Sequence, residues 1–194
     1  MKNVLFVDCL IRKDDSRTKI VADELINNLD PEYKITHLNL MEEDLKPLVG
    51  KFFDDRQVLL EQNNREHPRF RYAHQIADAD LVIIAAPFWD LSFPALLKIY
   101  IENCSVDGIT FMSDETGLHG LCKADNLVYV TTRGGIYKDS NWAQDVTYLK
   151  CIQEFFGFKD FKYIAADGMD INEDMKNHSL EQAKQQARQL AKQL

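Results

Sequence analysis

The sequence predicts an α/β protein with a doubly wound, five-stranded parallel sheet, strand order 2-1-3-4-5 and helices on both faces. Short apolar runs alternate with longer amphipathic ones from end to end, which is typical of βαβ units. Residues 81–86 form an unbroken apolar run, as expected of a strand covered on both faces. A chain of 194 residues that is 45% hydrophobic can bury a sizeable core, and we expect a single domain over residues 1–194.

The first strand is predicted at residues 3–7, where the apolar run Val4–Val7 follows Asn3. A helix over about 16–29 follows, because apolar side chains recur there at every fourth position: Val21, Leu25 and Leu29. Pro31 ends this helix, and residues 33–40 read as the second strand.

A variable, strongly charged segment at 41–78 follows, with helical stretches near 53–62 and 71–78, and it leads to the third strand at 81–86. A helix is expected to begin near Pro94, because proline is tolerated in a first helical turn. Its apolar residues continue at helical spacing: Leu97, Tyr100, Ile101 and Cys104.

The last two strands are predicted at 126–131 and 162–166, with a helix at 142–156 between them and a Gln- and Lys-rich helix at 173–194. Five parallel strands with right-handed crossovers most simply adopt the order 2-1-3-4-5. That order puts the ligand crevice at the carboxyl ends of strands one and three, where the function should be sought.

Composition excludes several classes of protein. A net charge of −8 argues against a broad nucleic-acid interface, and no run approaches the length of a membrane span, so we expect a cytoplasmic protein that binds neither nucleic acid nor membrane. The five histidines lack metal-ligand spacing, so no metal site is expected. The cysteines show no paired spacing and are expected to be reduced: Cys9, Cys104, Cys122 and Cys151.

The loop after the first strand, residues 8–18, contains no glycine, which excludes the Rossmann and Walker phosphate loops. It offers hydroxyls and cations at the start of a helix, where free N–H groups and the macrodipole favour an anion. This chemistry suits a single terminal phosphate. The alternative is an ordinary cap by Ser16 with exposed basic neighbours.

The loop after the third strand carries Phe88, Trp89 and Phe93 where an α/β loop is normally small and polar. A planar heteroaromatic ligand would explain these rings. The alternative is packing on the neighbouring helix or on a partner subunit. The loop after the fourth strand contains Gly134 and Gly135, which permit close backbone approach to a flat ligand, although a plain turn also explains them. The predicted strand order brings all three loops to one edge.

Three motifs carry a family resemblance: Ala86-Pro87-Phe88-Trp89, Gly108-Ile109-Thr110-Phe111 and Thr132-Arg133-Gly134-Gly135-Ile136-Tyr137. In their order and spacing they resemble the FMN-dependent NADH-azoreductases and NAD(P)H:quinone oxidoreductases, which have a flavodoxin-like fold. The similarity is dense from about 79 to 137 and is supported by Ser16-Arg17-Thr18, whereas residues 41–78 carry little of it.

The resemblance implies tightly bound FMN and assigns residues to it. The phosphate falls to Ser16, Arg17 and Thr18, with Cys9 and Arg12 nearby. Residues matching the segment around the isoalloxazine are Pro87, Phe88, Trp89, Asp90 and Leu91, and those on its pyrimidine side are Thr132, Arg133, Gly134 and Gly135. The family pattern has Asn where this chain has Asp90, and a carboxylate facing flavin N1 or O2 would disfavour an anionic reduced flavin. The family site spans a homodimer interface, and Phe111 would line the acceptor pocket.

The sequence therefore predicts an enzyme that passes hydride from NADH or NADPH through flavin N5 to a quinone or azo compound in a ping-pong reaction. FMN carries the chemistry, so no side-chain nucleophile is required. Tyr137 is a candidate hydrogen-bond donor to the acceptor, although an ordinary amphipathic tyrosine explains it equally well. The alternatives are a flavodoxin-type electron carrier that docks redox proteins, and an FMN-binding regulatory protein.

Overall fold

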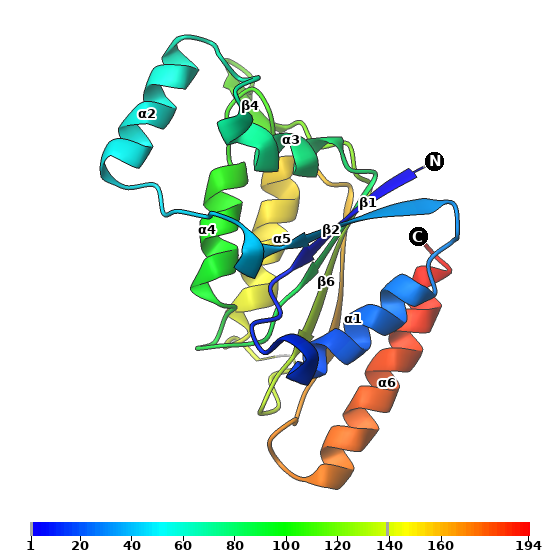
Figure 1. Cartoon of the computed structure of the whole chain (residues 1–194). Helices are drawn as coiled ribbons and strands as arrows, with labels where there is room; N and C mark the ends of the chain where they lie inside the picture. The colour runs from blue at the N-terminus through cyan, green and yellow to red at the C-terminus, as the bar shows by residue number, and fades with distance from the viewer. Residues whose placement is uncertain (1, 139) are drawn as a thin grey trace.

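The protein is described by a computed structural model that covers residues 2–138 and 140–194 (Figure 1). Its centre is a five-stranded parallel sheet with the order β2-β1-β3-β6-β7. The strands are β1 (Lys2–Asp8), β2 (Tyr33–Asn39), β3 (Leu81–Ala85), β6 (Asn126–Thr132) and β7 (Asp160–Ala166). Counted among these five strands alone, the order corresponds to the predicted 2-1-3-4-5.

The register of the sheet aligns the carboxyl ends of β1 and β3. Val4 of β1 pairs with Ile35 of β2 and with Leu81 of β3, and Asp8 at the end of β1 pairs with Ala85 at the end of β3. Every residue of β3 is buried, which agrees with its unbroken apolar sequence. The chain therefore leaves β1, β3 and β6 at one common edge.

Helices cover both faces of the sheet, as predicted. On one face α1 (Arg17–Asn27) and α6 (Glu173–Ala191) lie side by side and pack on β1, β3, β6 and β7 through alternate residues of those strands (Figure 1). On the other face lie α3 (Arg71–Asp78), α4 (Ala95–Cys104) and α5 (Gln144–Phe156). No helix in the described ranges is long and apolar enough to cross a membrane.

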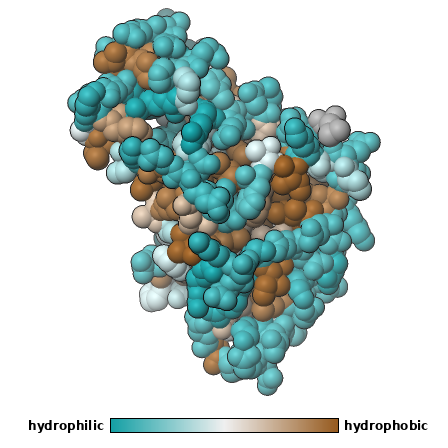
Figure 2. All heavy atoms as spheres, in the orientation of Figure 1, coloured by the Kyte–Doolittle hydropathy of each residue, from teal (hydrophilic) through white to brown (hydrophobic). Residues whose placement is uncertain are grey.

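The charged segment at 41–78 is partly helical, as predicted, but α2 (Gly50–Glu61) begins three residues before the predicted start. This helix stands away from the sheet at the upper left of Figure 1 and contains no fully buried residue. Arg56 ties it to the carboxyl end of α4 by donating to the carbonyl of Ser105, the residue after that helix, at 2.7 Å. Apolar side chains on α2, including Phe53 and Val58, remain exposed, and Figure 2 shows brown atoms over this region.

The structure contains an antiparallel hairpin that the sequence does not predict, formed by β4 (Phe111–Asp114) and β5 (Gly117–Gly120). It packs on the carboxyl end of α5, where Gly157 adopts a left-handed conformation with φ of 85°. Gly120 and Gly157 lie back to back, and a Cβ on Gly120 would collide with the backbone of residues 156 and 157. The absence of a side chain at both positions permits this contact.

Several boundaries differ from those predicted by one to three residues. The helix predicted at 142–156 begins at Gln144, the strand predicted from 162 begins at Asp160, and the last helix ends at Ala191. Capping explains one start: Ser16 has an extended backbone and caps α1, so the first helical residue is Arg17.

Candidate functional site

Loops from β1, β3 and β6 meet at the carboxyl edge of the sheet and enclose a cavity of about 220 Å³. Its lining comprises Arg12, Ser16, Arg17, Thr18, Pro87, Phe88, Trp89, Thr132, Arg133, Gly134, Met169 and Asp170. All of these except Met169 and Asp170 are residues that the sequence assigns to the site. Parallel strands explain the convergence, because each strand delivers its following loop to the same edge.

The loop after β1 reaches the cavity through the start of α1. Ser16 is buried and its Oγ accepts from the backbone N–H of Lys19 at 3.4 Å, so the expected N-cap is present. The N–H groups of Arg17 and Thr18, the first two residues of α1, have no partner inside the helix and point out of its N-terminus. Together with the guanidinium groups of Arg12 and Arg17, they make this end of the cavity suitable for an anion.

Cys9 does not line the cavity, although the resemblance placed it near the phosphate. It is fully buried in the core cluster that also contains Leu97 of α4. Burial, with a smaller contribution from Asp8, raises the pKa of the Cys9 thiol to about 12. Cys9 is therefore a protonated core residue.

A buried pair of hydroxyls joins two of the converging loops. Thr18 Oγ1 of α1 and Thr132 Oγ1 at the end of β6 lie 2.7 Å apart, and both residues line the cavity. One hydroxyl donates to the other, so each is satisfied without water. This contact fixes the anion-binding helix terminus relative to β6.

The loop after β3 contains a tight turn over residues 89–92. Trp89 and Ser92 exchange two backbone hydrogen bonds, at 2.9 and 2.8 Å, while Asp90 and Leu91 between them have φ of 49° and 68°. Two successive left-handed residues are typical of a type I′ turn, in which leucine is disfavoured. Phe88 and Trp89 face the cavity, but Asp90 and Leu91 do not line it. Phe93 is buried and packs on Tyr148 of α5, as the packing alternative predicts.

Arg133 is oriented by the protein interior. Its Nη2 donates to both carboxylate oxygens of Asp145 at 3.1 Å, and the two side chains are only 3% and 0% exposed. The guanidinium also lies 5.1 Å from the centre of the Phe88 ring. Burial raises the pKa of Asp145, and the adjacent Arg133 opposes that shift. Because Arg133 is already paired, its main contribution is to hold Phe88 and the loop after β6.

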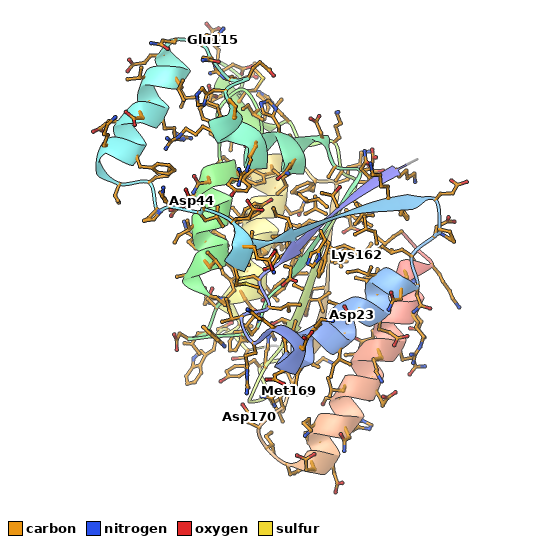
Figure 3. All side chains as sticks on the ribbon, in the orientation of Figure 1. Asp23, Asp44, Glu115, Lys162, Met169 and Asp170 are labelled. Carbon is orange, nitrogen blue, oxygen red and sulfur yellow. The ribbon has the colours of Figure 1, made fainter. Side chains whose placement is uncertain are left out.

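A fourth loop contributes to the site, and the sequence does not predict it. Residues 168–170, directly after β7, lie along the loop after β6 through three backbone hydrogen bonds of 2.8–3.0 Å, from Gly168, Met169 and Asp170 to Gly135, Arg133 and Gly134. Figure 3 shows Met169 and Asp170 beside the start of α1. The same strand-end reasoning would have found this loop, because β7 also ends at this edge.

The two glycines after β6 have different environments. Gly134 lines the cavity, and a Cβ there would collide with the carboxylate of Asp170. Gly135 does not line it, and a Cβ would lie 3.1 Å from the ring of Tyr137. The ring of Tyr137 in turn packs on Phe88, with 4.6 Å between ring centres. Tyr137 thus lies next to the cavity wall.

Phe111 lies outside this cavity. Its ring packs on Phe155 of α5 at 4.5 Å between ring centres, and Figure 1 shows β4 at the opposite end of the molecule from the start of α1. Within one chain, Phe111 therefore cannot contact a ligand in the cavity.

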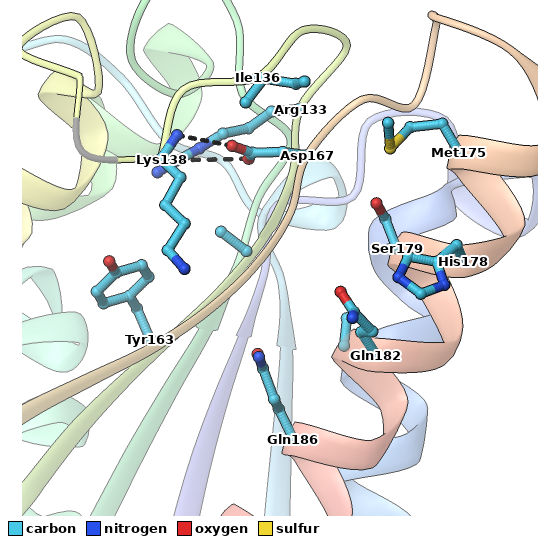
Figure 4. A pocket seen from close by; sticks show the side chains of 12 residues that line it. Arg133, Ile136, Lys138, Tyr163, Asp167, Met175, His178, Ser179, Gln182 and Gln186 are labelled. Carbon is cyan, nitrogen blue, oxygen red and sulfur yellow. Dashed lines mark hydrogen bonds and ion pairs between the residues drawn. The ribbon is translucent and has the colours of Figure 1, made fainter.

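A second, larger cavity of about 570 Å³ lies between β7 and α6 (Figure 4). Of its lining residues only Arg133 is shared with the smaller cavity. It is bordered by Lys138 and Tyr163 on one side and by Ser179, Gln182 and Gln186 of α6 on the other. Because the other site residues predicted from the sequence lie outside it, we regard the smaller cavity as the candidate site.

Comparisons with known proteins agree with the fold. A family described as having a flavodoxin-like fold matches residues 2–191. An FMN-dependent NADH:quinone oxidoreductase of Clostridium beijerinckii is 35% identical over 196 residues, covering 99% of each chain. One from Clostridium perfringens is 36% identical over 200 residues, again covering 99% of each.

Solved structures show the same architecture. An azoreductase from Bacillus anthracis has a TM-score of 0.88 and 22% identity and covers 100% of both chains. An FMN-dependent NADH-azoreductase from the same species, solved in complex with FMN, has a TM-score of 0.80 and 21% identity and covers 98% of this chain and 100% of its own.

Proposed function

Since this chain belongs to the flavodoxin-like family of the FMN-dependent NADH:quinone oxidoreductases, we propose that it binds FMN at the smaller cavity and uses NADH to reduce a quinone or an azo compound. Membership in this family of enzymes agrees with the resemblance carried by the three sequence motifs. The observation that carries the proposal is the convergence of an anion-binding helix terminus and an aromatic loop on one cavity.

The residues at the start of α1 fit the phosphate of FMN. A phosphate monoester carries about −1.5 to −2 charges and accepts several strong hydrogen bonds. Ser16 and Thr18 supply hydroxyls, and Arg12 and Arg17 supply guanidinium groups. The N–H groups of Arg17 and Thr18, the first two residues of α1, have no partner within the helix and can donate to the phosphate. The absence of a glycine-rich loop favours a single phosphate over the pyrophosphate of FAD.

The other wall of the cavity fits a flat heteroaromatic ring. Phe88 and Trp89 provide aromatic faces, and Thr132 and Gly134 bring backbone groups close to them. The N–H of Phe88 donates to the carbonyl of Thr132 at 3.2 Å, so the two loops are held at a fixed separation. This preorganisation would orient the ring without further ordering of the chain.

When bound at this cavity, FMN would supply the two-electron redox chemistry that links NADH to the acceptor, with hydride arriving at N5. The chain's own residues bind and orient: α1 holds the phosphate, Arg133 keeps Phe88 in place, and the aromatic loop shields the ring from water. We assign to the hydroxyl of Tyr137, whose ring packs on Phe88, the donation of a hydrogen bond to the acceptor. One site used in turn by donor and acceptor gives a ping-pong reaction.

We propose further that two copies of the chain complete the site. A cavity of about 220 Å³ is smaller than the roughly 300–1,000 Å³ of pockets that enclose a whole ligand. Large apolar side chains near it are exposed, namely Trp89, Leu91, Ile136 and Trp142. A second copy would cover them, and Phe111 of that copy could then approach the acceptor.

Stopped-flow spectroscopy of the FMN-loaded protein tests the proposal. Rapid mixing with NADH should bleach the absorbance of the bound flavin, and a small quinone should then restore its yellow colour. In steady-state assays, double-reciprocal plots of initial velocity should give parallel lines. Tyr137→Phe should slow only the quinone half-reaction, whereas Tyr163→Phe, on β7, should change neither.

The alternatives give different results. Reduction of the bound flavin by a partner reductase but not by NADH would identify an electron carrier. FMN binding without reduction by either would indicate a regulatory role. Failure to bind FMN would reject all three functions.

A further inference from the structure

Among the residues that line the smaller cavity, Asp170 carries a negative charge, although the rest of the cavity suits an anion. Three side chains that line this cavity are cationic, Arg12, Arg17 and Arg133, and Asp170 is the acidic one. Arg133 is already neutralised by the buried Asp145. The positive charges of Arg12 and Arg17 therefore remain available to a phosphate. The carboxylate of Asp170 offsets part of that positive charge.

Asp170 contacts one of these two cations directly. Arg17 Nη2 donates to Asp170 Oδ1 at 2.8 Å, and Arg17 Nη1 donates to the carbonyl of Met169 at 2.5 Å. Both terminal nitrogens of Arg17 are thus directed at the loop after β7. A bidentate contact with phosphate uses the same guanidinium donors, so phosphate and Asp170 would compete for them.

The loop does not need this ion pair to keep its position. Its backbone is held by the three hydrogen bonds to residues 133–135. The Asp170 side chain is 67% exposed and that of Arg17 is 30% exposed, and ion pairs at such exposure contribute only about 0–1 kcal/mol to stability. A purely structural role therefore explains little of why a carboxylate faces the cavity.

The position of this carboxylate depends on Gly134. A Cβ at residue 134 would displace the Asp170 carboxylate, so the glycine allows the carboxylate to lie against the loop after β6. The negative charge is thereby held at the cavity wall beside the start of α1 (Figure 3).

Resting on the function proposed above, we propose that Asp170 competes with the phosphate of FMN for Arg17 and thereby lowers the affinity of the site for phosphorylated flavin. Neutralising Asp170 should free the guanidinium donors of Arg17 for the phosphate. Riboflavin, which has no phosphate, should be indifferent to the change. Asp170 is thus a determinant of cofactor affinity in a loop outside the three sequence motifs.

Equilibrium titration of the purified full chain, followed by flavin fluorescence, tests this inference. Asp170→Asn should tighten FMN binding about two- to fivefold, as expected for an exposed charge pair, and leave riboflavin unchanged. The gain should shrink as salt is raised. Asp54→Asn, on the exposed surface of α2, makes the same change in net charge and should have no effect.

The same substitution made in an Arg17→Ala variant shows whether Asp170 acts through Arg17. Arg17→Ala should weaken FMN roughly tenfold or more, and adding Asp170→Asn to it should then give no further gain. Asp170→Ser should repeat the gain of the asparagine variant, with melting temperatures recorded for every protein.

Unchanged or weaker FMN binding by both Asp170 variants overturns the inference, as does a gain that persists in the Arg17→Ala background or extends to riboflavin. If the unaltered chain does not bind FMN at all, the proposed function fails first, so the two failures are distinguishable.

Discussion

The buried hydroxyls of Thr18 and Thr132 are hydrogen-bonded to each other, so each residue depends on the other for its partner. Thr18→Val would leave the buried Thr132 hydroxyl without a partner, which costs about 1–3 kcal/mol. Replacing both by valine removes the unsatisfied group, so the double variant should be more stable than the sum of the single losses predicts. Urea unfolding of the four proteins measures the coupling. Thr147→Val, on the exposed part of α5, is the control, and additive losses would contradict the pairing.

The sequence could predict which residues reach the site but not which way each side chain points. Strand ends determine the edge, and Ser16, Phe88 and Thr132, which the family resemblance assigns to the flavin, line the cavity at that edge. Cys9 also follows a strand end, yet it turns into the core against α4. Arg133 turns toward Asp145, whose position on α5 depends on how that helix packs. These orientations are tertiary and have no local signal.

Among the elements, the turn at 89–92 stores backbone strain next to the proposed flavin. Leu91 at φ of 68° is strained by about 1–2 kcal/mol, whereas Asp90 at 49° is of a type that tolerates this conformation. Leu91→Gly should therefore stabilise the protein by about 1 kcal/mol, after allowing for the greater flexibility of glycine in the unfolded chain. Asp90→Gly should be close to neutral. Thermal unfolding of both variants measures the difference, and a loss of stability in Leu91→Gly would show that the turn is not strained.

The elements that the sequence predicts are those with a buried face. The strand at 81–85 is recognisable as an unbroken apolar run because both of its faces are buried. The helix with Val21 and Leu25 is recognisable because burial of one face imposes a helical period on its sequence. The β4–β5 hairpin has no buried residue, so no alternation of apolar and polar residues marks it. The start of α2 was missed for the same reason, since that helix also contains no fully buried residue.

At the scale of the whole molecule, the exposed apolar side chains of Trp89, Leu91, Ile136 and Trp142 predict a homodimer. Trp142 is 64% exposed and Ile136 is 61% exposed. Both follow Gly134, which lines the proposed site, within eight residues of sequence. Trp142→Glu should shift the protein from dimer to monomer in sedimentation velocity at micromolar concentration, because burying a charge there is unfavourable. Tyr163→Glu, which places the same charge on the edge strand β7, should leave the dimer intact. An unaltered chain that is monomeric and still turns over substrate would remove the shared-site proposal.

The back-to-back glycines 120 and 157 restrict how this molecule can diverge in evolution. Neither position can acquire a side chain while the hairpin stays seated on the end of α5, because each lies against the backbone of the other. The residues at the two positions should therefore change together in evolution, although 36 residues of sequence separate them. In descendants of this chain the pair should be retained together or lost together, and its loss should coincide with a hairpin that has shifted, shortened or disappeared.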